Sequence, residues 1–144
     1  MDFELSLEEK RLQEETRAFV DREIRPLVPE VEKRKIPPIE VIRRMGRQGI
    51  FRLVVPKEYG GTYEVVRSLP ICIAREQLAK GYNLAGSSIA TQGLASYPLV
   101  LAGSDELRQL FLPGVASGEI IPAFALTEPE AGSDAAGLRT TALK

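Results

Sequence analysis

The residues best suited to chemistry lie in a polar segment that runs from Thr127 to Asp134. Thr127 and Ser133 carry hydroxyl groups, and Ser133 can also offer its backbone N–H to a phosphate. Gly132 has no side chain, so the backbone can approach a ligand closely there, while Pro129 narrows the conformations open to the loop. Thr-Glu-Pro and Gly-Ser-Asp are also good turn formers, so the segment taken alone is more typical of a simple connection.

Acidic side chains in the same segment have a different expected role. Glu128, Glu130 and Asp134 carry carboxylates, which repel phosphates. We therefore expect them to bind backbone N–H groups or to face water, and we assign none of them as a catalytic base. No metal site is expected either, because the chain has no histidine and one cysteine, Cys72. Cys72 lies in an apolar stretch, and we expect it to be a small buried hydrophobic residue.

Charge and hydropathy exclude several classes of partner. The chain carries 19 basic and 20 acidic residues, a net charge of −1. This balance provides no overall field to attract nucleic acid or an anionic membrane. The sequence has no apolar run near the roughly 18 residues that a membrane span needs, and its acidic start lacks the features of a secretion signal. We expect a soluble protein of the cytoplasm or of a mature organellar matrix.

The elements that must position the polar segment are helical over most of the chain. Ser6 to Glu9 has the pattern of a capping box and predicts a helix start. Pro26 and Pro29 should kink this helix or split it into two. Pro37-Pro38 predicts the start of a second helix that ends at Gly49, because glycine readily adopts the left-handed conformation there. Residues 51–55 are expected to be extended.

Three further helices are predicted. Ser68 is expected to cap a helix that ends before Gly81. The next helix, residues 83–102, is nearly uncharged and rich in small residues, which predicts burial on most sides. Ser104-Asp105-Glu106 predicts the start of another helix that Gly118 closes.

The sequence changes its pattern after Gly118. Residues 120–127 are β-like, and residues 139–144 could form a second strand. Two strands alone are marginal in water, so either about 100 further residues or another chain should complete the sheet. The predicted fold is mostly α, with a helical bundle over residues 1–118 followed by the first strands of an incomplete β-barrel-like domain over residues 119–144.

The segment from Ala125 to Gly137 resembles the motif of acyl-CoA dehydrogenases, small-aliphatic-Thr-Glu-Pro-x-x-Gly-Ser-Asp-x-x-Gly, with every defined position filled. Residues 49–61 resemble the loop after the second helix of that family. Residues 103–106 and 112–119 resemble its approach to the β domain. The resemblance covers essentially the whole chain, with its landmarks in order.

This resemblance implies the roles of specific residues. The stretch matching residues 124–133 holds FAD in the family, which assigns the flavin to Phe124, Ala125, Leu126, Thr127, Gly132 and Ser133. A flavin needs donors aimed at its ring oxygens and N5, and a strand running into a loop can supply them. Ser133 would also contact the acyl-CoA. The helix matching residues 83–102 lines the acyl cavity, which places Gly93, Leu94, Ser96 and Tyr97 near the acyl group. A buried core helix is the alternative interpretation.

The implied reaction is α,β-dehydrogenation of an acyl-CoA thioester. The family takes its catalytic glutamate from a C-terminal helical domain that has no counterpart in these residues. We therefore expect this polypeptide alone neither to retain FAD nor to dehydrogenate acyl-CoA. The family also implies electron-transferring flavoprotein as the electron acceptor and a homotetramer as the full-length assembly. Tyr97 is a candidate for shortening the acyl cavity.

Three alternatives to an acyl-CoA dehydrogenase are compatible with the sequence. Acyl-CoA oxidases and related nitroalkane or aryl-CoA dehydrogenases share much of the pattern. A non-catalytic helical module that pairs with a second chain would show the same helices. A CoA-thioester binder without redox chemistry is a weaker option, and flavin absorbance of the whole assembly would distinguish it from the flavoenzymes.

Overall fold

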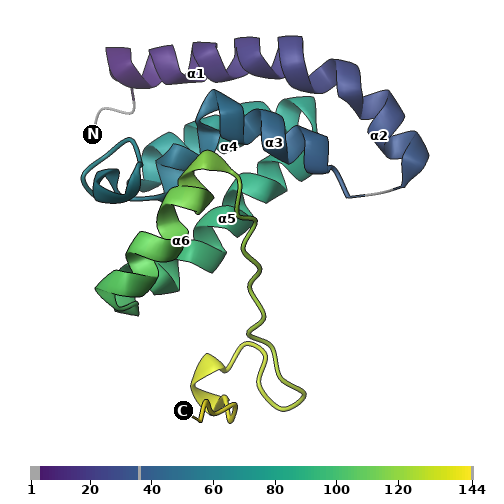
Figure 1. Ribbon diagram of the computed structural model, residues 1–144. Helices are drawn as coiled ribbons and strands as arrows, with labels where there is room; N and C mark the ends of the chain where they lie inside the picture. Colours follow the sequence, from purple (N-terminus) through teal and green to yellow (C-terminus); the bar gives the residue numbers. More distant parts are fainter. Residues whose placement is uncertain (1–3, 36, 144) are drawn as a thin grey trace.

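Helices arranged in layers make up most of the molecule (Figure 1). The computed structural model describes residues 4–35 and 37–143. The α-helices are α1 (Leu7–Phe19), α2 (Val28–Arg34), α3 (Ile39–Gln48), α4 (Ser68–Gly81), α5 (Asn83–Ala102) and α6 (Asp105–Ser117). Helix α4 packs against both α1 and α5. This arrangement confirms the predicted mostly helical fold.

The first helix begins and bends as the sequence predicts. The Ser6 hydroxyl accepts from the Glu9 backbone N–H, and the Glu9 carboxylate accepts from the Ser6 N–H at 2.8 Å, so the capping box is complete. After α1 the chain forms a π-helical turn (Val20–Ile24) and a 3₁₀ turn (Arg25–Leu27) before α2. Pro26 and Pro29 lie at the starts of the last two elements, which accounts for the split helix.

The hydrophobic core sits where α3, α4, α5 and α6 meet a short turn of 3₁₀ helix, Ile50–Val54. We expected extended backbone over residues 51–55, and that expectation was wrong: only Val55 is extended. Gly49, in the left-handed conformation, ends α3 and leads directly into this tight turn. The turn buries four apolar side chains at once, and the periodicity of a short apolar run cannot distinguish that arrangement from a buried strand.

Helix α4 departs from the sequence prediction at its start. It begins at Ser68, but the N-cap residue is Arg67 and no side chain caps the helix. Gly81 is the last helical residue rather than the residue after the end. Cys72 is exposed, which corrects its predicted burial, because the buried face of α4 is formed by its neighbours Ile73 and Ala74.

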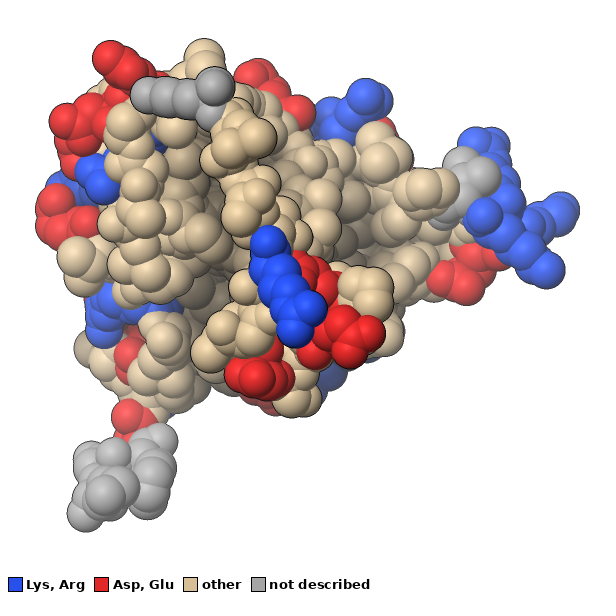
Figure 2. Space-filling view, turned by 90° about the horizontal axis from the view of Figure 1, so that it is seen from below, with Lys and Arg blue, Asp and Glu red and all other residues tan. Residues whose placement is uncertain are grey.

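Helix α5 is buried along one side and exposed along the other. Ala85 and Ile89 are fully buried, whereas Leu94 and Leu101 are 55% and 66% exposed. The prediction that this helix is buried on most sides is therefore wrong for the described chain. Figure 2 shows the molecule from below: uncharged residues cover most of this face, and charged residues lie around its edges and in one group near its centre.

Helices α3 and α6 approach each other closely at two glycines. A Cβ built on Gly46 would lie 2.4 Å from the Ser117 carbonyl oxygen and 3.0 Å from the Gly118 Cα. Gly118 has a φ of 78° and ends α6, as predicted. Backbone contact at this point therefore fixes where the chain leaves the helical layers.

After Gly118 the chain runs away from the helices and ends in a looped segment (Figure 1). Residues 121–127 and 138–143 are not helical, but they form no strand, in contrast to the two predicted strands. Lys144 lies outside the described residues. Among the described residues the β-type pairings are isolated bridges, Pro56–Tyr63 and Glu128–Ala131. An extended segment without a neighbouring strand has no ladder to join, which explains the difference.

The described helices include none that is both long enough and apolar enough to cross a lipid bilayer.

Candidate functional site

The polar segment after α6 folds as a closed turn held by its own backbone. The Glu128 N–H donates to the Ala131 carbonyl oxygen at 3.0 Å, and the Ala131 N–H donates to the Glu128 carbonyl oxygen at 3.2 Å. Ala131 is buried beneath the turn, whereas Thr127, Gly132 and Ser133 are exposed. The two hydroxyl groups and the glycine predicted to contact a ligand therefore lie on the outside of one turn.

The Glu128 side chain has a structural task. Its carboxylate accepts the backbone N–H of Arg139 at 2.9 Å and that of Thr140 at 2.8 Å, and it also accepts the Thr140 hydroxyl. The Thr140 hydroxyl and then these two N–H groups hold the pKa of the Glu128 carboxyl below its usual value. Glu128 thus joins the turn to residues 139–140, in keeping with the expectation that it binds backbone N–H groups.

The extended residues before the turn have unused hydrogen-bonding capacity. Phe124, Ala125, Leu126 and Thr127 are exposed, and within the described chain their backbone groups have no hydrogen-bond partner. A Cβ built on Gly132 would meet no atom within 4 Å. Open space and unpaired N–H groups therefore occur together on this stretch. Exposed N–H groups of this kind can donate hydrogen bonds to a ligand.

A cavity lies along one flank of α5, next to residues predicted to contact the acyl group. It has a volume of about 400 Å³. Its lining residues come from α5, the start of α4, the loop before α4 and the 3₁₀ turn: Val54, Val66, Ser68, Ile71, Ile89, Ala90, Gly93, Leu94 and Tyr97. All are uncharged, and only Ser68 and Tyr97 carry a hydroxyl group. The cavity is therefore suited to an aliphatic chain.

The structure brings three of the four predicted acyl-contacting residues together. Gly93, Leu94 and Tyr97 line this cavity, as their helical spacing allows. A side chain on Gly93 would press against Val54 at 3.2 Å, so glycine preserves the space between them. Ser96 does not line it: it is buried, and its hydroxyl donates to the Gln92 carbonyl oxygen at 2.7 Å. One residue turns a helix by about 100°, which rotates Ser96 away from Tyr97.

Several lining residues were missed by sequence reasoning. Ile89 and Ala90 precede Gly93 by one helical turn, so helical spacing could have identified them. Val54 and Val66 lie in non-helical segments far from α5 in sequence, and no local pattern connects them to it. The turn at residues 127–133 does not line this cavity, and Figure 1 shows it beyond the lower end of the helices.

The chain is similar in sequence and structure to known proteins. The family model for the N-terminal domain of acyl-CoA dehydrogenases matches residues 6–119. A glutaryl-CoA dehydrogenase from Desulfococcus multivorans is 35% identical over 144 residues, which is 99% of this chain and 37% of that protein. The chain thus spans little more than a third of this relative.

Solved structures show the same likeness. Butyryl-CoA dehydrogenase from Megasphaera elsdenii superposes with a TM-score of 0.83 at 28% identity, over 97% of this chain and 37% of the other. An acyl-CoA dehydrogenase from Bacillus anthracis in complex with FAD gives a TM-score of 0.80 at 28% identity, over 94% of this chain and 23% of the other.

Proposed function

Because this chain belongs to the acyl-CoA dehydrogenase family, we propose that it forms the N-terminal part of an FAD-dependent enzyme that oxidises an acyl-CoA thioester between its α and β carbons. In this proposal residues 1–118 are the helical domain and residues 119–144 begin the β domain. The observation that carries it is the uncharged cavity of about 400 Å³ on α5, in which Gly93, Leu94 and Tyr97 meet. An apolar cavity of this kind favours an acyl tail over a polar substrate.

The turn after α6 is the proposed flavin site. Thr127, Gly132 and Ser133 lie exposed on it, and Phe124, Ala125 and Leu126 precede it with unpaired backbone groups. FAD, when bound, would supply the oxidant for the reaction. The protein's own contribution there is to orient donors: the Thr127 hydroxyl toward the ring, and the Ser133 N–H and hydroxyl toward phosphate or acyl-CoA. Glu128 keeps the turn closed while these groups face outward.

The uncharged lining of the cavity restricts the charge of the proposed acyl group. Glutaryl-CoA, the substrate named for one relative, carries a carboxylate at the far end of its acyl chain. No Lys or Arg is among the described residues that line the cavity. Burying a carboxylate without a partner costs several kcal/mol. We therefore propose that the acyl tail is neutral. No Asp or Glu is among these described lining residues either, so proton abstraction needs a base from elsewhere.

The flavin assignment is tested by binding. The protein would be purified from its natural reading frame and its affinity for FAD measured by flavin fluorescence. We expect Thr127→Val to raise the Kd for FAD about 2- to 12-fold, which corresponds to one neutral hydrogen bond. Thr141→Val is the matched control, since Thr141 is exposed and lies outside the turn. Equal affinity in the Thr127 variant and the natural protein would contradict the assignment.

The acyl-site assignment is tested by substrate preference. We expect a higher kcat/KM for pentanoyl-CoA than for glutaryl-CoA, because only the latter buries a charge. Tyr97→Ala should shift the preferred acyl chain toward greater length, since it removes a ring from the cavity wall. Leu101→Ala on the same helix is the control, because Leu101 is exposed outside the cavity. An unchanged chain-length profile in the Tyr97 variant would refute its role.

Two further parts of the proposal concern partners. Electron-transferring flavoprotein as the electron acceptor and a homotetramer as the assembly both rest on the family resemblance. Reduction of that flavoprotein by substrate-reduced enzyme, and the mass of the assembly in solution, would test them directly.

A further inference from the structure

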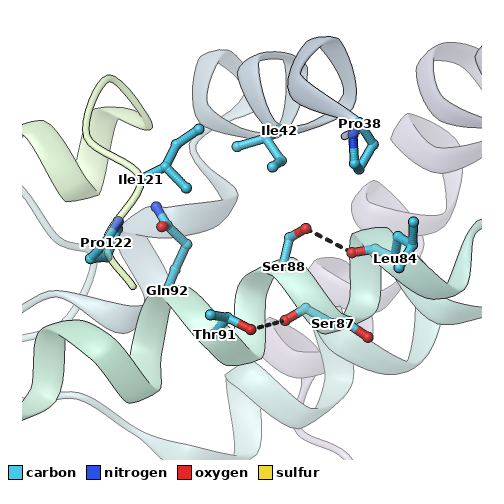
Figure 3. A pocket seen from close by; sticks show the side chains of 9 residues that line it. All are labelled: Pro38, Ile42, Leu84, Ser87, Ser88, Thr91, Gln92, Ile121 and Pro122. Carbon is cyan, nitrogen blue, oxygen red and sulfur yellow. Dashed lines mark hydrogen bonds between the residues drawn. The ribbon is translucent and has the colours of Figure 1, made fainter. Parts of the chain in front are cut away.

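A second cavity lies on the opposite side of α5, and it shares no lining residue with the acyl cavity (Figure 3). Its volume is about 200 Å³. Pro38 and Ile42 at the start of α3 form one wall, and Ile121 and Pro122 of the segment after α6 form another. Helix α5 supplies the floor with Leu84, Ser87, Ser88, Thr91 and Gln92. Three separate parts of the chain therefore build this cavity.

Gln92 is the unusual residue of this cavity. It is only 2% exposed, and its side-chain N–H donates to the Ile120 carbonyl oxygen at 3.3 Å. Its Oε1 is buried and has no hydrogen-bond partner in the described chain. Figure 3 shows its amide extending from α5 toward Ile121, at one end of the cavity. Buried polar atoms in native proteins nearly always have a partner, so this oxygen indicates a missing hydrogen-bond donor.

Two hydroxyl groups of the floor are also placed to accept a hydrogen bond rather than to donate one. The Ser88 hydroxyl donates to the Leu84 carbonyl oxygen at 2.7 Å, and the Thr91 hydroxyl donates to the Ser87 carbonyl oxygen at 3.0 Å. Their protons are thus used within the helix, which leaves both oxygens with lone pairs that can only accept. No ionisable residue is among the described lining residues. A charged ligand would be desolvated there without a partner.

We propose that this cavity binds a small neutral molecule that carries an O–H or N–H donor on a short aliphatic body, and that the donor binds the Gln92 Oε1. The side chains of Pro38, Ile42, Leu84 and Ile121 cover the aliphatic part. One water takes about 30 Å³, so the volume of about 200 Å³ suits roughly six heavy atoms. A five-carbon primary alcohol has this size and this single donor.

The proposal is tested with pentan-1-ol and with butyl methyl ether, which has the same number of heavy atoms and no donor. Each would be titrated into ¹⁵N-labelled protein without flavin, so the result does not depend on the proposed enzymatic function. We expect the alcohol to shift the signals of the Gln92 side-chain amide and the Ile121 backbone amide. It should bind about 2- to 12-fold more tightly than the ether, the contribution of one neutral hydrogen bond.

Two variants separate binding from folding. Gln92→Met removes the acceptor and should make alcohol and ether bind equally. Ser88→Leu fills the cavity, leaves Gln92 in place and should abolish both titrations. Ala95→Leu on the same helix is the control, because Ala95 lines neither cavity, and it should bind as the unmodified protein does.

Three results would overturn the proposal. The first is equal binding of alcohol and ether by the unmodified protein. The second is unchanged binding in the Ser88 variant. The third is the absence of any shift at Gln92 up to the solubility limit of the alcohol, as expected if water alone occupies the cavity. Should Gln92→Met fail to fold, the Ser88 variant and the two-ligand comparison still decide the question.

Discussion

Adding a single methyl group at the contact between α3 and α6 should destabilise the protein. The variant is Gly46→Ala, and the new Cβ would lie 2.4 Å from the Ser117 carbonyl oxygen and 3.0 Å from the Gly118 Cα. Both atoms belong to the backbone, so neither can move aside by changing a side-chain rotamer. Relief requires α3 and α6 to separate, which disturbs the buried side chains between them, including Met45 and Leu112.

Two opposing effects set the size of the change. Alanine is favoured over glycine in a helix interior by about 0.8–1 kcal/mol. Overpacking a close contact costs about 1–3 kcal/mol, and a backbone obstacle places this site at the upper end of that range. We therefore expect a net loss of about 1–2 kcal/mol in the free energy of unfolding. For a chain of 144 residues this lowers Tm by roughly 3–8 °C.

Thermal and urea unfolding, followed by far-ultraviolet circular dichroism, measure the effect. Gly132→Ala is the matched control, because a Cβ there meets no atom within 4 Å. That variant should stay within about 0.5 kcal/mol of the natural sequence. If Gly46→Ala were as stable as the control or more stable, the higher helix propensity of alanine would exceed the cost of overpacking. The close approach of α3 and α6 would then not be rigid.

Three other predictions concern hydrogen bonds and pH. Ser6→Ala should lose about 1 kcal/mol of unfolding free energy, because it breaks the capping box of α1, and urea unfolding measures this. Burial, and then its hydrogen bond to Glu32, raises the pKa of Tyr82 to about 12. Folding therefore favours its protonated form. That stability is present below the ordinary tyrosine pKa near 10 and is lost as pH rises toward 12. Tyr82→Phe should flatten this part of the stability profile, and an unchanged alkaline slope would refute the cause. The lowered pKa of Glu128 has the opposite effect on the pH dependence. Its ionised carboxylate stabilises the closed turn at pH values above the ordinary glutamate pKa, and this stabilisation is lost as pH falls through the pKa of the folded protein. Hydrogen exchange at the Arg139 and Thr140 amides should accelerate there in acid, and Glu128→Gln should remove most of the dependence.

Local rules predicted the start of α1 and the ends of α3 and α6, but not the capping of α4. The capping box at Ser6 and the glycines at positions 49 and 118 act through neighbouring backbone atoms, so a few residues contain all the information needed. The 3₁₀ turn at residues 50–54 was missed because its conformation depends on the burial of four side chains among distant helices. Cys72 was misplaced for a related reason, since its exposure depends on how α4 is rotated against α1 and α5.

The part of the candidate site that lies on the single helix α5 could be predicted from the sequence. Gly93, Leu94 and Tyr97 lie on the same side of one helix, and their spacing implies that they meet. Ser96 shows the limit of naming neighbours in sequence, because it points into the protein. Gln92 could not be identified from the sequence. An amide side chain in an uncharged helix does not indicate that its oxygen will be buried without a hydrogen-bond partner.

Helix α5 separates two compartments whose walls are built from different side chains. The residues that line one cavity can therefore be mutated while those that line the other stay unchanged. The ligand preference of each cavity could then be altered separately. A spectroscopic label attached on one flank would likewise report selectively on what enters that cavity. If a ligand in one cavity changed the signal of a label beside the other, that change would measure how far a local displacement is transmitted across this 20-residue helix.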